Sequence, residues 1–328
     1  MLNKQIKMSL NENKMSETDN TNLKVVSFNL LVQCYAGSSQ PDDRTCLQDS
    51  YRFGLLTKLL KNEIEIGTNI FCFQEVSWEW RNRLVSFFRE NGYDFTYDNY
   101  GHKYNDYMGV MMAWNSKTFS ATESSVVVGD QLTEPADLVK PTMSWCELIS
   151  SKLCYRPKPE RVTTYEASMK SFKDAARRKN VLQCVKLTNS KGNVVNVMNY
   201  HMPCAFYDLE QMRLHIEFVV NLANSKAKSA PVILTGDFNT KPNDVTYNGF
   251  SSLKNAYVEI YGKNPSATNN AKTLRGTRVS EFIGTLDYCF FSDGLTPYYA
   301  NATDASIPMP NMTWPSDHSM IKFHFSFA

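Results

Sequence analysis

Residues 232–239, VILTGDFN, constrain the fold most, because they place a carboxylate and a carboxamide at the end of an apolar run. The run is typical of a strand that ends at the edge of a sheet. Side chains two residues apart on a strand point the same way, so Asp237 and Asn239 are expected to face together. An Asp there can deprotonate a water that the Asn helps to position, as metal-assisted phosphoester hydrolysis requires. By itself, GDxN is also a common turn.

Polar residues also stand at the ends of other apolar runs, where a core strand has no use for them. They are Asn29 in KVVSFNL, Glu75 in NIFCFQEV, His201 in NVVNVMNYH, Asp287 in GTLDYCFF, and Asp317-His318 before SMIKFHF. Each one has an ordinary structural alternative: a turn former, a helix N-terminal residue, a satisfied core histidine or a cap. Their joint order along one chain is what indicates chemistry.

In that order these residues resemble the motifs of the endonuclease/exonuclease/phosphatase superfamily. Its members are metal-dependent phosphodiesterases, typified by pancreatic deoxyribonuclease and the abasic-site endonucleases. The resemblance runs from about residue 24 to residue 327. It implies an α/β fold: a four-layered α/β sandwich in which two mixed β-sheets pack face to face, with helices outside.

Flanking residues are similar to one branch of that superfamily, which contains the deadenylases, nocturnin, Angel and the 2′-phosphodiesterases. The similar segments are GDFNTKPNDVTYNGF, GTLDYCFFS, NYHMP and PSDH. In the deadenylases a Phe five residues before the LDY aspartate stacks on the substrate base, and here that position is Phe282. Ordinary core packing is the alternative for Phe282. The inositol-phosphatase signatures GDLNYR and WTDRIL are absent, and no leucine-rich repeats precede the motifs.

The candidate metal ligands are hard oxygen donors, and no Cys/His spacing is typical of zinc, so one or two Mg²⁺ or Mn²⁺ ions are expected. By resemblance, Glu75 holds the principal ion, Asn29 assists, and Asp317 lies near a metal.

The resemblance also assigns the catalytic residues. Asp237 activates the attacking water and Asn239 orients it, while His201 stabilises the pentacovalent phosphorane. Asp287 holds His318 beside the scissile phosphate. Positioning and charge neutralisation of this kind account for most of phosphoryl-transfer catalysis.

Composition agrees with one large domain. The 328 residues are 42% hydrophobic, enough for a sizeable core, and a net charge of +2 neither demands nor excludes nucleic acid. The eight cysteines show no CxxC spacing and are interpreted as reduced thiols. The first ~22 residues lack the apolar core of a secretory signal, and no run approaches the ~18 apolar residues of a membrane span. We therefore expect an intracellular, cytoplasmic protein without a membrane partner. Residues 1–22 are expected to form a disordered N-terminal extension, and residues 23–328 the catalytic domain.

A basic segment at about residues 151–181 interrupts the regular pattern. It ends in Arg177, Arg178 and Lys179, which lead into the strand upstream of His201. Either this segment is a solvated loop, or it contacts the phosphate backbone of nucleic acid near the site.

Apolar periodicity places the other elements. It predicts strands at residues 24–30, 70–73 and 108–114, helices at 51–66, 77–90 and 208–223, and a hairpin from 181–187 and 194–200, with 126–128 and 145–151 as weaker strand candidates.

The sequence thus favours a Mg²⁺-dependent phosphodiesterase acting on RNA or oligonucleotide, of the 3′→5′ exonuclease, deadenylase type that releases 5′-nucleotides. The alternatives are a DNA nuclease or DNA-repair phosphodiesterase on the same fold and a non-catalytic RNA-binding relative. A small dinucleotide substrate stays open. A lipid phosphodiesterase of the sphingomyelinase kind lacks support, since no membrane-inserting apolar hairpin is evident.

Overall fold

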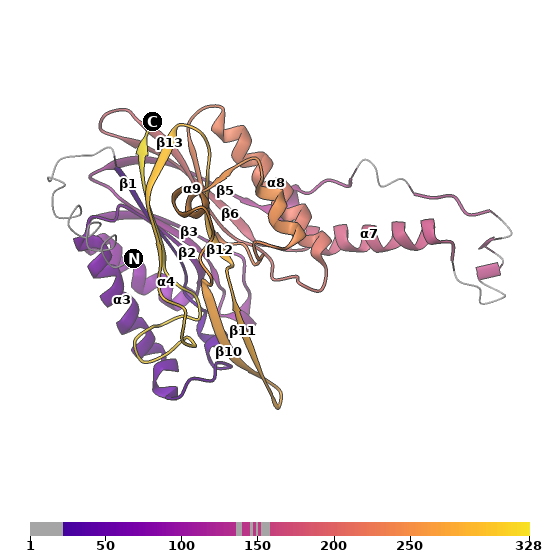
Figure 1. The fold of residues 1–328 in the computed structure, drawn as a ribbon, viewed down its shortest axis with the longest axis horizontal. Coiled ribbons are helices and arrows are strands. Elements are labelled where there is room, and N and C mark those ends of the chain that lie inside the picture. The colour runs from indigo at the N-terminus through magenta and orange to yellow at the C-terminus, as the bar shows by residue number, and fades with distance from the viewer. Residues whose placement is uncertain (1–21, 136–139, 145–146, 149, 152–157) are drawn as a thin grey trace.

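Two six-stranded sheets pack face to face, and helices cover both outer faces (Figure 1). This computed structural model describes residues 22–135, 140–144, 147–148, 150–151 and 158–328. The predicted four-layered α/β sandwich is confirmed. Apart from Asn22, the predicted N-terminal extension lies outside the described residues.

The first sheet, which we call sheet 1, has the strand order β13-β14-β1-β2-β4-β3. β1 runs parallel to β2 and antiparallel to β14, so the sheet is mixed. Its strands are β1 (Asn22–Asn29), β2 (Ile70–Val76), β3 (Tyr93–Asn99), β4 (Gly109–Asn115), β13 (Leu295–Ala302) and β14 (Ile321–Phe327).

The second sheet, sheet 2, has the order β5-β6-β7-β8-β12-β9, with β7 and β8 parallel. Its strands are β5 (Phe119–Val127), β6 (Val181–Asn189), β7 (Val194–His201), β8 (Val232–Asp237), β9 (Lys254–Asn255) and β12 (Asp287–Phe291). The predicted hairpin is confirmed, because β6 and β7 pair antiparallel.

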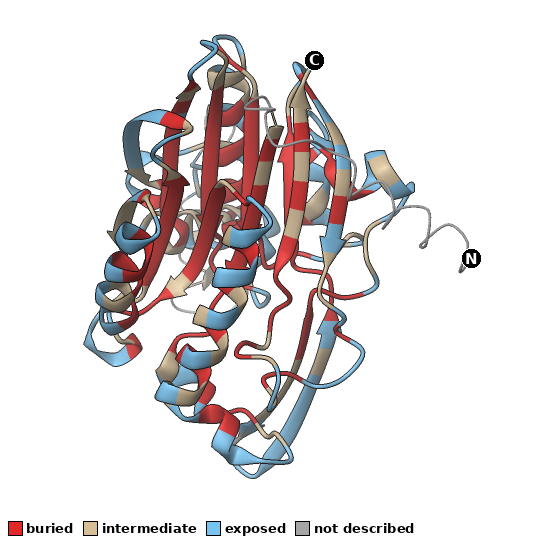
Figure 2. Cartoon of the chain, turned by 90° about the vertical axis from the view of Figure 1, so that its left-hand side faces the viewer, coloured by how far each residue is buried: buried red, intermediate tan, exposed pale blue. Residues whose placement is uncertain are grey.

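The central strands read as continuous apolar runs because both of their faces are buried (Figure 2). One face of each sheet contributes to the cluster between the sheets, which includes Val25, Met112, Val197, Ile233 and Phe323. The edge strand β5 has mostly exposed residues. The most apolar segments of the sequence therefore form the central strands of the sandwich.

Helices cover the outer faces with the apolar stripes that the sequence predicted. Sheet 1 is covered by α3 (Asp49–Glu65) and α4 (Trp78–Glu90), and sheet 2 by α8 (Leu209–Ala227). The Ser77 side chain caps α4 by accepting a hydrogen bond from the Trp80 N–H. The shorter helices are α2 (Gln33–Ala36), α5 (Val128–Gln131), α9 (Ala256–Tyr261) and the 3₁₀ turns η1 (Arg44–Leu47), η2 (Lys103–Asn105) and η3 (Val245–Phe250).

A separate hairpin extends from the sandwich, formed by β10 (Asn269–Arg275) and β11 (Arg278–Gly284) (Figure 1). Its β11 strand is mostly exposed. A bridge between Ser39 and Thr273 ties the hairpin to the loop that follows α2.

Three sequence predictions need correction. Residues 126–127 do belong to a strand, but Val128 begins α5. The described part of 145–151 is helical, not a strand. Of the two alternatives left open for the basic segment, a solvated loop does not fit Glu160–Ala176, which forms helix α7; this helix packs on α8 and extends away from the sandwich (Figure 1).

Among the described residues, no helix has both the length and the apolar character needed to cross a bilayer. Four cysteines, Cys46, Cys72, Cys184 and Cys289, are buried thiols, as expected of small apolar residues.

Candidate active site

Strand register brings three of the predicted residues into one row at the end of sheet 2. His201 of β7 lies opposite Asp237 of β8, and Asp287 of β12 lies opposite Asp237 on the other side. Neighbouring strands are about 4.8 Å apart, so these three side chains meet at one edge. All three are buried.

Gly236 makes this register possible. Its φ is +149°, and a Cβ atom there would lie 1.9 Å from the carbonyl oxygen of Tyr200. A side chain of any size would therefore force β7 and β8 apart. The glycine of the GDFN motif lets the two strands approach closely enough to place His201 beside Asp237.

Sheet 1 contributes Asn29 and Glu75 from its parallel strands β1 and β2. The Asn29 Nδ2 donates to Oδ2 of Asp237 at 2.9 Å and to Oε1 of Glu75 at 3.2 Å, so one amide joins the two sheets. Glu75 sits at an irregularity in the β2–β4 pairing with φ +55°, and its Oε2 accepts the Val32 N–H at 3.0 Å. Such left-handed backbone in a non-glycine residue is held only where its surroundings fix it, and it clusters at functional sites.

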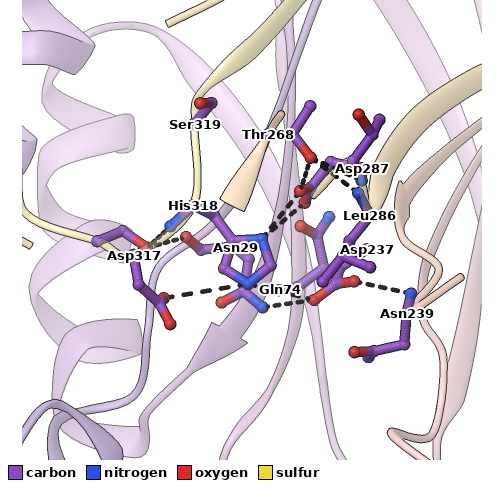
Figure 3. A network of polar contacts seen from close by, with 12 residues as sticks. Asn29, Gln74, Asp237, Asn239, Thr268, Leu286, Asp287, Asp317, His318 and Ser319 are labelled. Carbon is purple, nitrogen blue, oxygen red and sulfur yellow. Dashed lines mark hydrogen bonds and ion pairs between the residues drawn. The ribbon is translucent and has the colours of Figure 1, made fainter. Parts of the chain in front are cut away.

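The loop before β14 supplies Asp317 and His318 (Figure 3). The Ser316 hydroxyl donates to the Asn29 carbonyl at 2.7 Å and accepts the His318 N–H at 3.1 Å, which fixes this loop against β1. His318 then reaches Oδ2 of Asp287 through Nδ1 at 2.9 Å, and its Nε2 lies 3.5 Å from Oδ2 of Asp237.

His318 and Asp287 form a buried ion pair. Burial opposes the charge on His318, but the carboxylates of Asp287 and Asp237 outweigh it and raise the pKa of His318 well above its usual value. Burial raises the pKa of Asp287 to about 6, and His318 counteracts that shift. The Thr268 hydroxyl also donates to Asp287 at 2.6 Å. The imidazolium therefore presents an Nε2–H donor to the site.

Asn239 contacts Asp237, but strand alternation, which the sequence suggested, is not the reason. β8 ends at Asp237, so strand alternation does not extend to Asn239, whose φ is +47°. Its N–H donates to Oδ1 of Asp237 at 2.9 Å, and its Nδ2 donates to the Met202 carbonyl at 2.9 Å. Asn239 thus orients Asp237 through its backbone and braces the loop after His201 through its side chain.

Sequence reasoning missed Tyr100. Its hydroxyl lies 2.6 Å from Nδ1 of His201, while Nε2 of His201 lies 3.6 Å from Oδ2 of Asp237 and 3.9 Å from Oε1 of Glu75. Burial, with Glu75 and Asp237, raises the pKa of Tyr100 well above its usual value, so the hydroxyl keeps its proton. No apolar run ends at Tyr100, and its sequence context carries no signal.

Arg52 of α3 was also missed. Its side chain is fully buried and donates to three backbone carbonyls, those of Leu30, Leu31 and Pro315, on either side of the site. Burial lowers the pKa of Arg52 to about 10, against the opposing effect of Asp317. The sequence did indicate that Arg52 is buried, because it stands four residues before the buried Leu56 and therefore on the apolar face of the helix.

Two groups of side chains have donors for a metal. Asp237, Asp287 and His318 offer ligand atoms within 4.8 Å of one another and could hold an ion. In the second group, Asp317 Oδ1 is buried and has no hydrogen-bond partner among the described residues. Burial raises the pKa of Asp317, and Glu75 adds to the shift. The carboxylates of Glu75 and Asp317 are hard oxygen donors that fit Mg²⁺ or Mn²⁺. The Asn29 amide oxygen instead accepts the Leu31 N–H at 3.0 Å, so Asn29 contributes to this group through its contact with Glu75.

The predicted substrate-binding residues lie on two separate elements, the β10–β11 hairpin and the end of the basic segment. Phe282 is half-buried on the exposed β11 strand, with the Lys241 Nζ 4.9 Å from its ring centroid, so it is not a core residue. Asn180, next to Lys179, donates to the His201 carbonyl at 2.8 Å. This contact places the end of the basic segment beside β7.

The three basic residues differ in what they contact. Arg177 pairs with Asp174 at 3.3 Å, and Lys179 pairs with Asp130 at 2.5 Å. Arg178 instead donates to the Tyr207 hydroxyl at 2.5 Å.

Comparisons with known proteins identify the family and the fold. The model of the Endonuclease/Exonuclease/phosphatase family matches residues 26–318. No curated protein matches the sequence. The fold is similar to that of ANGEL2, a 2′,3′-cyclic phosphatase solved in complex with adenosine-2′,3′-vanadate, with a TM-score of 0.65, 16% identity, and coverage of 93% of this chain and 96% of that one.

Two further structures show the same likeness of fold. The human Nocturnin catalytic domain with a bound sulfate anion has a TM-score of 0.62 and 18% identity, covering 95% of this chain and 97% of that one. The D. rerio TDP2 structure complexed with a single-stranded DNA product has a TM-score of 0.61 and 13% identity, covering 93% and 99%.

Proposed function

Since the chain belongs to the Endonuclease/Exonuclease/phosphatase family, whose members hydrolyse phosphoester bonds, we propose that it is a divalent-metal-dependent phosphodiesterase acting on RNA or oligonucleotide. The observation that carries this proposal is the position of Asp237, which lies within 3.6 Å of both His201 and His318 and accepts from Asn29. Residues 23–328 then form the catalytic domain.

Asp237 is the general base in this proposal. Its two oxygens are oriented by the Asn239 N–H and the Asn29 amide, so the carboxylate cannot rotate away from the site. A water beside this carboxylate gives up a proton to it as its oxygen attacks phosphorus, and the bond between phosphorus and the leaving ester oxygen breaks. Positioned general bases typically contribute about 10²- to 10⁴-fold to the rate.

The two histidines stabilise the charge that develops on the phosphate oxygens. His318 donates through Nε2 because Asp287 holds its Nδ1 and keeps it protonated. His201 is proposed to donate through Nε2 as well, because Nε2 faces Asp237 and Glu75 and this tautomer leaves Nδ1 to accept from the Tyr100 hydroxyl. Fixed donors of this kind in a buried site need little reorganisation as the charge forms.

Glu75 and Asp317 would hold the metal in this proposal, and Asn29 would assist by orienting Glu75. A bound Mg²⁺ or Mn²⁺ ion neutralises charge on the phosphate and activates water at neutral pH. Asp237 is left to proton transfer and His318 to charge stabilisation, since the Nδ1 of His318 is held by Asp287 and an imidazolium has no lone pair for a metal. The Arg52 side chain supports these metal-binding residues by donating hydrogen bonds to the backbone carbonyls of residues 30, 31 and 315.

The substrate we propose is the 3′ end of RNA, degraded 3′→5′ with release of 5′-nucleotides. Similarity of the NYHMP, LDY and PSDH segments to the deadenylase branch supports this choice. So does Phe282, whose ring stands on an exposed hairpin where a terminal base can stack on it. Arg177, Arg178 and Lys179 are proposed to contact the phosphate backbone beside β7.

The test is incubation with Mg²⁺ and a 5′-labelled RNA that ends in oligoadenosine, with Asp237→Ala beside it. A ladder that shortens from the 3′ end, absent in the variant, supports the proposal. Cleavage of single-stranded DNA of the same sequence, with the RNA left intact, would move the assignment to the DNA nuclease alternative. Binding of RNA without turnover of any substrate would favour the non-catalytic relative.

A second candidate is hydrolysis of a 2′,3′-cyclic phosphate at an RNA end. It is favoured by the likeness to ANGEL2, a 2′,3′-cyclic phosphatase, over 93% of this chain. An RNA that carries this terminus separates the two activities, because opening or removal of the terminal phosphate leaves the length of the chain unchanged.

A further inference from the structure

Exposed aromatic side chains gather beside the site, at the start of α4 and on the loop between β3 and β4. Trp78 is 51% exposed, Tyr107 is 49% exposed and Tyr104 is 76% exposed. The ring of Tyr97 lies 6.2 Å from the ring of Trp78. We call these four residues the aromatic surface. Tyr97 is partly buried and packs against the core cluster of sheet 1, whereas Trp78, Tyr104 and Tyr107 belong to no hydrophobic cluster of the described residues, so core packing does not explain these three.

Cations lie against these rings. The Arg81 guanidinium is 5.2 Å from the centroid of the Trp78 ring and 5.8 Å from that of Tyr97, and the Lys103 Nζ is 4.8 Å from that of Tyr104. Guanidinium or ammonium groups interleaved with exposed rings can bind a polyanion that also presents flat apolar groups. Single-stranded nucleic acid has both.

Backbone contacts attach the aromatic surface to the site. The Tyr97 hydroxyl donates to the carbonyl of Val76, the residue after Glu75, at 3.3 Å, and to the Tyr107 carbonyl at 3.0 Å. The same loop carries Tyr100, which bonds to His201. One face of the loop therefore lines the site while the other presents rings to solvent.

The loop is held in an unfavourable conformation that presents these rings. Asp106 and Tyr107 both have left-handed backbone, with φ of +52° and +50°. The Trp78 N–H donates to the Asp106 carbonyl, and the Cys34 N–H donates to its carboxylate, both at 3.1 Å. Contacts from two separate elements thus hold this turn in its left-handed conformation. The exposed side chain of Tyr107 on this turn packs into no hydrophobic core, as is typical of a ligand-binding loop.

We propose that the aromatic surface binds the unpaired nucleotides that flank the scissile phosphate, so that the substrate must be single-stranded next to the point of cleavage. This inference rests on the proposed function. It adds a second contact region on the Glu75 side of the site, in addition to Phe282 and the basic residues near β7.

The test is direct binding by fluorescence anisotropy, in an Asp237→Asn background so that no substrate is consumed. The probes are a labelled single-stranded RNA and the same RNA annealed to its complement. We expect Trp78→Ala with Tyr104→Ala to weaken single-strand binding by at least about tenfold, since each stacked base contributes substantially to affinity. The duplex, whose bases are already paired and stacked, should bind this variant and its parent almost equally.

Tyr261→Ala is the matched control, because Tyr261 is an aromatic of α9 that is 47% exposed and packs near β13 instead of the site. It should bind both probes as the parent does. Tyr104→Ala alone tests the surface without a folding effect, because most of the Tyr104 side chain is in solvent. We expect this variant to lose about fivefold in affinity for the single-stranded RNA.

The outcomes separate this inference from the proposed function. Unchanged single-strand affinity in the double variant overturns the aromatic surface, whatever the enzyme hydrolyses. An equal loss for duplex and single strand also overturns it, because unpaired bases are then not what the rings recognise. Failure of the wild-type protein to hydrolyse any nucleotide substrate refutes the proposed function, and the anisotropy result still decides the surface.

Discussion

The Tyr100 hydroxyl lies 2.6 Å from Nδ1 of His201, and this contact determines which nitrogen of His201 faces the carboxylates. The tyrosine keeps its proton and Nε2 faces the carboxylates of Asp237 and Glu75, so the tautomer that suits both contacts has the hydrogen on Nε2 and leaves Nδ1 to accept from the hydroxyl. The chemistry proposed for His201 therefore depends on a residue about a hundred positions earlier in the chain.

Tyr100→Phe should lower kcat by about tenfold, which corresponds to ~1.4 kcal/mol, the size of one buried hydrogen bond. KM should change little, because His201 acts on charge that develops in the transition state. Steady-state kinetics check this. Tyr261→Phe, which removes a hydroxyl donor to Ala300 far from the site, is the control and should leave kcat unchanged. A Tyr100→Phe enzyme with full kcat would contradict the assigned role.

Asp237→Asn should lower kcat by about 10²- to 10⁴-fold, since the general base is lost. Its melting temperature without metal should fall, because Asp237 accepts from Asn29 and the Asn239 N–H and faces the His318 imidazolium at 3.5 Å. Differential scanning calorimetry in a chelator measures this. An unchanged or higher melting temperature would show that repulsion from the neighbouring carboxylates outweighs these contacts.

Mg²⁺ or Mn²⁺ should raise the melting temperature of the wild-type protein, because an ion that binds only the folded state adds ~2.7 kcal/mol at a concentration a hundredfold above its Kd. Glu75→Gln and Asp317→Asn should each reduce this increase. Thermal melts over a metal titration give the answer without an activity assay. If both variants respond as the wild type does, the ion is held by Asp237, Asp287 and His318 instead.

Acid should destabilise the protein between about pH 6.5 and pH 4, through His215. Burial lowers the pKa of His215 to about 4, and its ring is held by the Tyr200 hydroxyl and the Ala175 carbonyl. Because the unfolded state binds the proton more tightly, the stability this group contributes is present above pH 6.5 and is lost as the pH falls towards 4, by up to ~3 kcal/mol. Denaturant unfolding at several pH values measures the slope. His215→Gln should make it shallower; an unchanged slope would assign the acid sensitivity to other groups, such as His324.

Gly236→Ala should destabilise the fold by ~3 kcal/mol or more, because its Cβ would overlap the Tyr200 carbonyl and the strands would have to separate. Gly54→Ala is the matched control, since Gly54 lies in α3 with nothing within 4 Å of its Cβ position. It should stabilise the protein by about 0.5–1 kcal/mol through helix propensity. Equal effects of the two changes in chemical denaturation would contradict the close approach of β7 and β8.

Apolar patterning was enough to place the ends of the central strands, whereas the sandwich was expected from the resemblance of the motifs to a known superfamily. Strands buried on both faces need continuous apolar runs, and a polar residue at the end of such a run stands out, as Asn29, Glu75, His201 and Asp237 do. Helices α3, α4 and α8 followed from apolar spacing in the same way. These patterns involve residues that are close together in the sequence, and local interactions determine them.

Only the tertiary structure decided how those strand ends meet. The register of β7, β8 and β12, the Tyr100–His201 contact and the burial of Arg52 join residues that lie far apart in the sequence. The left-handed backbone of Asn239 opposes local preference, and its side-chain bond to the Met202 carbonyl, far away in the sequence, helps to hold it. Periodicity in one segment carries no information about such contacts, because their free energy exists only once both partners are in place.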